Sequence, residues 1–243
     1  MKHQTLGVLV IGNEILSGRT HELNAHLAAQ RCFELGCRLE EVVVVPDEES
    51  RIVETLNRLR RSYDAVITSG GIGPTHDDIT MQAVAAAFSV PLHEHADIIK
   101  AMIERFGTEK LNPARRRMAI VPEGAELIRC RRTPSPGVRL ENVYVLAGVP
   151  EIFADQLDVI SSGFGGIPRL RREIDVSLPE SLFSKPLSDI QNRHPEIEIG
   201  SYPGSCKPPY SGRICLSGSD KRLLDAALAE VMNMLKPMQG SLD

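Results

Sequence analysis

Apolar residues in the first two thirds of the chain form short unbroken runs, separated by segments in which they recur every three or four positions. An unbroken run bounded by turn residues is typical of a strand buried on both faces of a parallel sheet. A spacing of three or four positions is typical of a helix with one apolar face. The runs include Leu6–Ile11, Val42–Val45 and Ala65–Ile67. The pattern therefore predicts an α/β domain, a three-layer fold with a mostly parallel sheet and helices on both faces.

Local signals predict where several elements begin and end. Thr20 is a residue type that caps helices, and it precedes a helical pattern whose apolar face is expected to include Leu23 and Leu27. Gly36 is expected to end that helix, because glycine adopts the left-handed conformation found at helix ends. The segment 90–95 is predicted to be a connector that leads into a helix over 96–106.

A second, smaller unit is predicted in the last third of the chain. The segment Ser161–Pro168 is rich in glycine and serine, a composition typical of a linker. Beyond it, the pattern predicts a βαββα unit built from segments 170–177, 179 onward, 196–202, 213–217 and 220–235. We therefore expect a large domain over residues 1–165 and a small α+β domain over residues 169–243, without a catalytic constellation in the latter.

The third predicted strand ends in a glycine-rich loop with the sequence Ser69-Gly70-Gly71-Ile72-Gly73-Pro74-Thr75-His76-Asp77-Asp78. Glycines let a backbone turn through positive φ and approach a ligand closely, and the N–H groups of the loop and of the following helix can bind an anion. Asp77 and Asp78 place two carboxylates beside that anion site, where a divalent cation is needed to offset their repulsion of a phosphate. The loop therefore predicts a metal-assisted phosphate or pyrophosphate site, with a simple tight turn as the alternative.

Polar residues also follow the other predicted parallel strands. Glu14 lies in the loop after the first strand and Asp47 after the second, at the sheet edge where open α/β sheets bind ligands. A solvated acid is the alternative for Glu14, and a helix cap is the alternative for Asp47. Asn24 is expected in the first turn of a helix near the same edge. Gly148, before a helix that begins near Pro150, offers a second possible phosphate cradle.

Two clusters of basic or metal-binding residue types are expected to lie on the surface. Arg115, Arg116 and Arg117 project at successive steps of about 100° on a helix, so at most one or two of them can face one ligand. His93 and His95 form a His-x-His pair without a third ligand of matching spacing. We therefore predict a solvated face for the arginines and surface positions for the histidines.

Composition narrows the partners and the compartment. The 243-residue chain has a net charge of −4 and a pI near 6.0, which gives no general attraction to nucleic acid or to an anionic membrane. Its N-terminus lacks the apolar segment of a signal peptide, and no run approaches the roughly 18 apolar residues of a membrane span. Five cysteines without a CxxC pair are expected to be reduced thiols. We expect a cytoplasmic protein that is able to form a homo-oligomer.

The string from Ser69 to Thr80 closely resembles the signature of the MoaB/Mog-like domain of molybdenum cofactor biosynthesis. The version it resembles is that of CinA-type proteins and of the molybdopterin-binding-like domain of eukaryotic FAD synthases. The segment Gly12–Gly18 is similar to the N-terminal motif of CinA-type proteins, and Ile199–Pro203 lies in a segment similar to their small second domain. The resemblance therefore extends over nearly the whole chain.

Three functions are consistent with these motifs. The first is a hydrolase, dependent on Mg²⁺, Mn²⁺ or Co²⁺, that acts on the pyrophosphate of a nucleotide such as ADP-ribose or FAD. The second, implied by the resemblance, is an enzyme that adenylylates molybdopterin, and the third is a non-catalytic module that binds a pterin or a nucleotide. We expect Asp78, Asp47 and Glu14 to be catalytic, with Asp78 and Asp47 holding the metal. The residues expected to bind the phosphate ester are Gly12, Ser17, Gly18, Asn24, Ser69, Gly70, Gly71, Gly73, Pro74, Thr75, Gly148 and Pro150.

Overall fold

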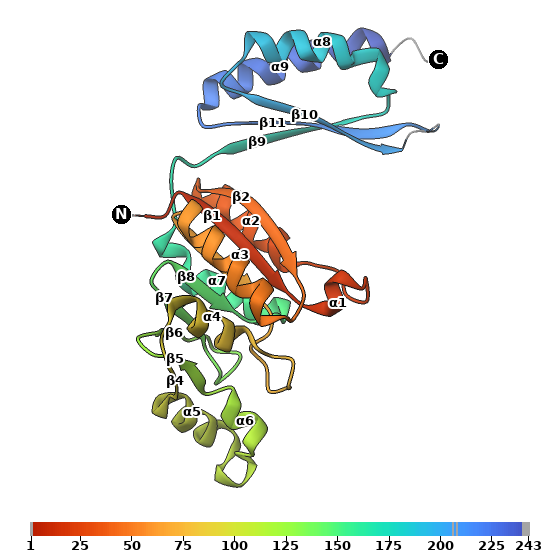
Figure 1. Ribbon diagram of the computed structural model, residues 1–243. Helices are drawn as coiled ribbons and strands as arrows, with labels where there is room; N and C mark the ends of the chain where they lie inside the picture. The colour runs from red at the N-terminus through yellow and green to blue at the C-terminus, as the bar shows by residue number, and fades with distance from the viewer. Residues whose placement is uncertain (1, 206, 208, 240–243) are drawn as a thin grey trace. The chain divides into compact units, whose positions relative to one another are not determined.

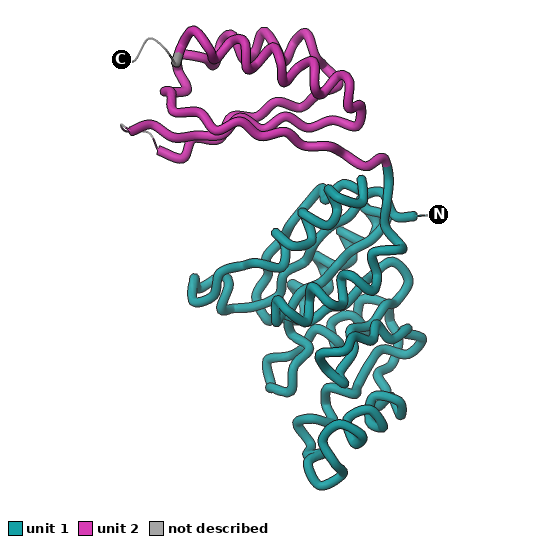
Figure 2. The backbone as a smooth tube through the Cα atoms, turned by 180° about the vertical axis from the view of Figure 1, so that it is seen from behind, with its two compact units in different colours: residues 1–166 teal, residues 167–243 magenta. Residues whose placement is uncertain are grey.

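The computed structural model describes residues 2–205, 207 and 209–239 and divides them into two compact units. The first unit ends at Gly166, and the second begins at Ile167 (Figures 1 and 2). Each unit has its own buried apolar core: two clusters on opposite faces of a sheet in the first, and one cluster in the second.

The first unit is built on a six-stranded sheet in the order β2-β1-β3-β8-β7-β6. Its strands are β1 (Thr5–Ile11), β2 (Arg38–Val45), β3 (Ala65–Ser69), β6 (Glu126–Ile128), β7 (Gly137–Leu140) and β8 (Val143–Leu146). The first four strands in this order are parallel, and β7 and β6 continue the sheet in antiparallel pairs. The prediction of a mostly parallel sheet is thereby confirmed.

Helices cover both faces of this sheet (Figure 1). On one face, α2 (Asn24–Leu35) and α7 (Pro150–Ile160) bury Cys32 and Phe153 in one apolar cluster. On the other face, α3 (Glu49–Ser62) and α4 (Thr80–Phe88) bury Leu56 and Val84 in the second cluster. The unbroken apolar runs of β1 and β3 are explained by this arrangement, because a strand covered on both faces has no solvent side.

The chain changes direction across the sheet beside β1. It passes from β1 to β2 on one side and then returns to β3 on the other side of β1. The loops that leave the carboxyl ends of β1 and β3 therefore diverge, one toward each face. In open α/β sheets the crevice at such a switch point is where ligands bind.

Three local predictions were wrong for identifiable reasons. Val42 is 44% exposed, because β2 is the edge strand of the sheet and its burial alternates. Leu23 is 52% exposed and itself occupies the N-cap of α2, so Thr20 does not start the helix. The connector over 90–95 contains strand β4 (Leu92–Glu94), which pairs with β5 (Ile120–Pro122).

The excursion between β4 and β5 carries the remaining small elements of the first unit. It contains the helices α5 (Ala96–Phe106) and α6 (Pro113–Arg117), with the 3-10 turn η1 (Thr108–Lys110) between them. Asn112 caps α6 by accepting a hydrogen bond from the Arg115 N–H, and proline occupies the first turn of α6. His95 likewise caps α5 by accepting from the Asp97 N–H through Nδ1.

The second unit has the predicted βαββα order. A three-stranded antiparallel sheet, β10-β11-β9, packs one face against both helices (Figure 1). The elements are β9 (Leu170–Val176), α8 (Glu180–Arg193), β10 (Glu198–Ser205), β11 (Ser211–Gly218) and α9 (Lys221–Gln239). The other face of the sheet carries ion pairs across strands, such as those of Arg213 with Glu173 and Asp175. Charged pairs of this kind are typical of a sheet face that is not covered.

The cysteines of the described residues are free thiols, as the absence of a CxxC pair predicted. Among the described residues, Cys32, Cys37, Cys130 and Cys215 are free thiols, while Cys206 lies outside the described residues. A side-chain hydrogen bond with Cys37, together with burial, raises the pKa of the Cys32 thiol and keeps it protonated. No helix in the described part of the chain has the length and apolar character that a membrane crossing requires.

The first part of the segment Ser161–Pro168 packs in the core of the first unit. Ser161–Gly163 forms the 3-10 turn η2, and Phe164 is 1% exposed in the cluster beneath α2 and α7. The Phe164 ring lies 5.2 Å from that of Tyr144, and the Gly166 N–H donates to the Leu35 carbonyl. The core of the first unit is therefore closed by residues up to Gly166.

We predict that a chain ending at Gly166 folds on its own, because it retains every side chain of its two clusters. Phe164→Ala in this shortened chain is expected to lower the free energy of unfolding by about 3–5 kcal/mol, the cost of removing a buried aromatic ring. Urea unfolding followed by circular dichroism measures both effects. A shortened chain without a cooperative transition would show that the first unit depends on the second for its stability.

Candidate functional site

The loop after β1 is joined to the end of β2 at the switch point. The Gly12 N–H donates to the Val45 carbonyl at 3.2 Å, and the Asn13 N–H donates to Asp47 Oδ2 at 2.8 Å. Asp47 thus caps the short helix α1 (Asn13–Leu16), whereas the cap expected from its sequence position was that of α3. Glu14 lies within α1, and a Cβ added to Gly12 would lie 2.6 Å from its Oε1. Gly12, Glu14 and Asp47 therefore form one cluster.

Asn24 joins three elements at the carboxyl edge of the sheet. Its side chain is 3% exposed, and Nδ2 donates both to Ser69 Oγ and to the Gly148 carbonyl, each at 2.8 Å. The amide therefore fixes the end of β3 and the loop before α7 relative to the first turn of α2. Its Oδ1 is buried without a hydrogen-bond donor in the described part of the chain, which costs free energy of folding.

The first two glycines of the loop after β3 are required by the backbone. Gly70 has φ 101° and Gly71 has φ 68°, values that favour glycine. A Cβ on Gly70 would overlap the Ile11 carbonyl oxygen, and one on Gly71 would overlap Thr80 Oγ1. Gly148 approaches the same place, since a Cβ there would lie 3.1 Å from the Gly70 Cα. The ends of β1, β3 and β8 are therefore in backbone contact.

Thr80 fixes the loop against the start of α4. Its Oγ1 donates to the Gly70 carbonyl at 2.8 Å, and its N–H donates to the Gly71 carbonyl at 3.0 Å. Both carbonyls of the glycine pair are thereby turned toward Thr80. The Gly70 N–H is also paired, since it donates to the Leu146 carbonyl at 3.4 Å.

Residues with unpaired backbone N–H groups line a cavity of about 30 Å³ beside this loop. Within the described structure, no hydrogen-bond acceptor faces the N–H groups of Gly71, Ile72 and Gly73, or those of Met81 and Gln82 in the first turn of α4. All five residues line the cavity. Unpaired N–H groups of a glycine loop and of a helix start form a site suited to an anion.

Asp78 lies at the same cavity, and its neighbour Asp77 lies outside it. Asp78 Oδ2 accepts hydrogen bonds from the Thr75 N–H at 2.8 Å and from the Thr75 hydroxyl. Asp77 has 60% of its side chain exposed, 3.9 Å from His76.

Of the predicted site residues, Gly71, Gly73 and Asp78 line the cavity, whereas Glu14, Asp47 and the other predicted ligand residues do not. Ser17 and Gly18 are exposed, and no hydrogen bond among the described residues joins them to the glycine loop. Pro74 and Thr75 are exposed in the loop, and Pro150 is the exposed first residue of α7. His93 and His95 take part in no group of three or more His, Cys, Asp or Glu side chains, since the described residues contain no such group.

The cavity also contains a basic residue to which the sequence analysis gave no role. Arg117, at the end of α6, lines it together with Met118, Ile120 and the glycine loop. Arg117 is exposed, which agrees with the solvated face predicted for the three arginines, and it also lines the cavity. No periodicity or motif signals its position, because the excursion that carries α6 is paired to the rest of the unit through β4 and β5.

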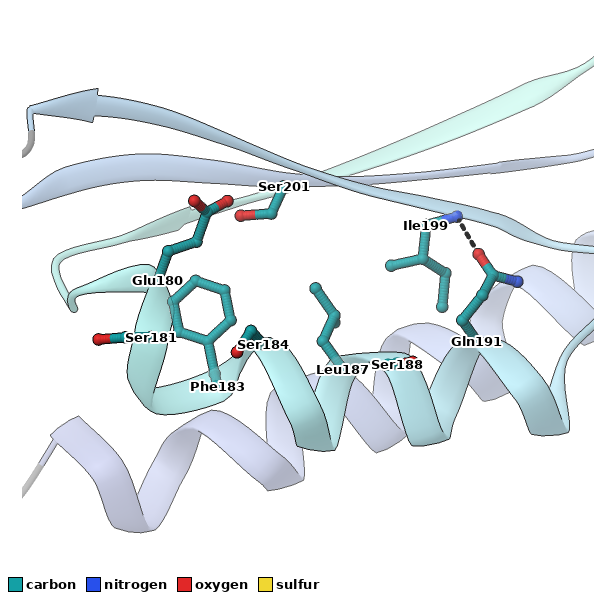
Figure 3. A pocket seen from close by; sticks show the side chains of 9 residues that line it. All are labelled: Glu180, Ser181, Phe183, Ser184, Leu187, Ser188, Gln191, Ile199 and Ser201. Atoms are coloured by element: carbon teal, nitrogen blue, oxygen red, sulfur yellow. Dashed lines mark hydrogen bonds between the residues drawn. The ribbon is translucent and has the colours of Figure 1, made fainter.

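Two larger cavities, of about 540 and 220 Å³, lie in the second unit. The larger one lies between α8 and β10, where Phe183, Leu187 and Ile199 face the space between polar ends (Figure 3). Edge strand β10 offers few unpaired backbone N–H donors there, because the Ile199 N–H donates to Gln191 Oε1 and Pro203 has no N–H. We therefore place the candidate site at the cavity of about 30 Å³ beside the glycine loop, which is lined by residues with unpaired N–H groups and by charged side chains.

Comparisons with known proteins are consistent with both units. Residues 7–172 match the model of the probable molybdopterin binding domain, and residues 168–239 match that of the FAD synthase middle domain. The chain is 32% identical to a probable FAD synthase of Caenorhabditis briggsae and 30% identical to a CinA-like protein of Myxococcus xanthus, over 96% of its length in both cases. It spans 50% of the former and 59% of the latter.

A solved structure supports the fold of the first unit. The crystal structure of the CinA protein of unknown function from Thermoplasma acidophilum matches with a TM-score of 0.62 and 28% identity. The match covers 65% of this chain and 96% of that one.

We predict that Gly71→Ala destabilises the protein more than Gly18→Ala does, by about 1–3 kcal/mol, the usual cost of forcing extra atoms into a packed site. The two glycines form a matched pair, since φ is 68° at Gly71 and 71° at Gly18, but a Cβ on Gly18 meets nothing within 4 Å. Urea unfolding with equal m-values gives the comparison. The double variant G71A/T80A should lose less than the sum of its single variants; equal losses for G71A and G18A would contradict the packing described.

Proposed function

The chain belongs to the probable molybdopterin binding domain family, and we propose that its glycine-loop site binds and hydrolyses a small phosphate ester of the molybdopterin, ADP-ribose or FAD class. The observation that carries the proposal is the set of unpaired N–H groups from Gly71 to Gly73 and at the start of α4. These donors lie at the switch point between β1 and β3. A phosphate is the anion whose several oxygens use such a set of donors.

Charge at the site favours a ligand accompanied by a cation. Glu14, Asp47 and Asp78 all lie on loops that leave the carboxyl edge of the sheet, and a pyrophosphate adds further negative charge. Two unit charges 4 Å apart interact by roughly 4 kcal/mol at an effective dielectric of about 20. A helix N-terminus contributes only about 0.3–1 kcal/mol of opposing interaction. We therefore propose that Mg²⁺, Mn²⁺ or Co²⁺ accompanies the phosphate.

The carboxylates are compatible with such a cation. Asp47 and Asp78 each use Oδ2 in the protein's own hydrogen bonds, and in the described structure no hydrogen bond is made by either Oδ1. Mg²⁺ is usually bound by one or two carboxylates together with substrate phosphates and water, so a group of three protein ligands is not required. Asp47 and Asp78 would hold the ion, which would supply positive charge to the phosphoryl oxygens.

In the proposed hydrolysis, the loop N–H groups, Asn24 and Glu14 have different roles. The loop N–H groups hold the phosphate oxygens, and Asn24 keeps Ser69 and Gly148 in place beneath them. Glu14 is the candidate to take a proton from the attacking water. Water adds to one phosphorus as the bridging P–O bond breaks, so FAD would yield AMP and FMN, and ADP-ribose would yield AMP and ribose 5-phosphate.

The family match to the molybdopterin binding domain favours a second candidate, transfer of an adenylyl group to molybdopterin. The same phosphate site would then hold ATP, and the phosphate of molybdopterin would attack its α-phosphorus with release of pyrophosphate. The two candidates differ in their products. A module that only binds the ligand would give neither set of products.

The test is to incubate the purified protein with ADP-ribose, with FAD, and with ATP plus molybdopterin, under each cation and in EDTA, and to identify products by mass spectrometry. We predict AMP from at least one dinucleotide, with turnover that requires a cation. Asp78→Asn is expected to lower turnover by about 10²-fold or more, because it removes a charge at the cavity. Asp77→Asn is the matched control and should change turnover little, since its side chain is exposed outside the cavity.

Three outcomes would contradict parts of this account. Binding without products would leave the site as a binding module and reject hydrolysis. Full turnover by D78N would remove Asp78 from the mechanism. Absence of both binding and products with every substrate would reject the phosphate-ester function.

A further inference from the structure

We propose that Arg117 is a phosphate-binding residue of the glycine-loop site and selects for ligands that carry a phosphate there. The inference rests on the proposed function and extends it to a residue on a separate part of the chain. Arg117 is the one arginine or lysine among the residues lining the cavity formed by Gly71, Gly73 and Asp78. The cavity thus combines a cationic side chain with unpaired backbone donors.

The three consecutive arginines of α6 differ in their partners. Arg115 lies over the Phe106 ring, with Cζ 4.5 Å from the ring centroid, and donates to the Lys110 carbonyl. Arg116 makes two hydrogen bonds to the Glu94 carboxylate, at 2.9 and 2.7 Å. Both side chains are therefore used to attach α6 to its own excursion, the first to α5 and η1 and the second to β4.

Arg117 has no such role. Within the described residues it makes no hydrogen bond or ion pair, and no ion pair joins it to Asp78 across the cavity. An arginine that supports the fold is expected to have a carboxylate, carbonyl or aromatic partner, as its two neighbours do. The donors of Arg117 remain available to a group that enters the cavity.

The chemistry of the cavity identifies that group as a phosphate. The guanidinium presents a planar fork of N–H donors that binds two oxygens of one phosphate, and the loop N–H groups can bind the remaining oxygens. The volume of about 30 Å³ is close to the share of one water molecule in the liquid, so only one end of a ligand enters, and the rest lies outside. Arg117 also offsets the charge of Asp78 beside the phosphate.

Pairing through β4 and β5 brings Arg117 to this place. The Glu94–Ile120 pair at the end of that two-stranded sheet fixes the chain just after α6. The residue is thus held by a part of the chain that contains none of the family-like motifs.

The experiment compares two variants that remove the same charge from adjacent positions. Arg117→Gln and Arg116→Gln are titrated calorimetrically with ADP-ribose and with adenosine, both in Mg²⁺. R117Q is expected to weaken ADP-ribose binding at least about tenfold, as loss of a hydrogen bond to a charged group does, and to leave adenosine binding unchanged. R116Q should bind ADP-ribose like the wild type, because it loses only an exposed ion pair to Glu94.

Arg117→Lys separates charge from geometry. It retains the charge but not the fork, so its affinity for ADP-ribose should lie between those of the wild type and R117Q. Equal affinities of R117Q and R116Q for ADP-ribose would overturn the inference and leave the proposed function standing. A wild-type protein that binds neither ADP-ribose nor FAD would overturn the proposed function, and the inference with it. Melting temperatures of all variants close to that of the wild type exclude unfolding as the cause.

Discussion

The site depends on one close backbone contact, between Gly70 and the carbonyl of Ile11. At this point the end of β3 lies so near the end of β1 that a side chain of any size on Gly70 would overlap the Ile11 oxygen. The contact is compatible only with a positive φ at Gly70, and Gly71 continues the same turn with its own positive φ. The loop therefore leaves the sheet with its carbonyls toward Thr80 and its next N–H groups unpaired.

The surrounding structure supports that contact from two sides. Asn24 fixes Ser69 and Gly148 from beneath, and Asp47 fixes the start of α1 beside Gly12. Neither residue needs to touch a ligand for its substitution to affect binding, since both determine where the backbone of the loops lies. Asp47 and Asp78 each serve the fold through Oδ2, and in the described structure neither Oδ1 makes a hydrogen bond.

Sequence reasoning identified the elements whose signals are local. The unbroken apolar runs of β1 and β3, the glycine loop and the βαββα order of the second unit all appear in the structure. It failed where burial depends on neighbours distant in the chain. Val42 belongs to an apolar run, but β2 lies at the edge, so its side chain is exposed. Arg117 is exposed as predicted, but no local signal indicates its place at the cavity, which results from the pairing of β4 with β5.

The most direct test of the account is to observe where a phosphate ester binds. Backbone amide resonances of the ¹⁵N-labelled protein are followed while ADP-ribose is added in the presence of Mg²⁺. The account predicts that the largest shift changes occur at Gly71, Ile72, Gly73, Met81 and Gln82, the residues whose N–H groups are unpaired at the cavity. Shift changes confined to residues of the cavity between α8 and β10 in the second unit would contradict the account.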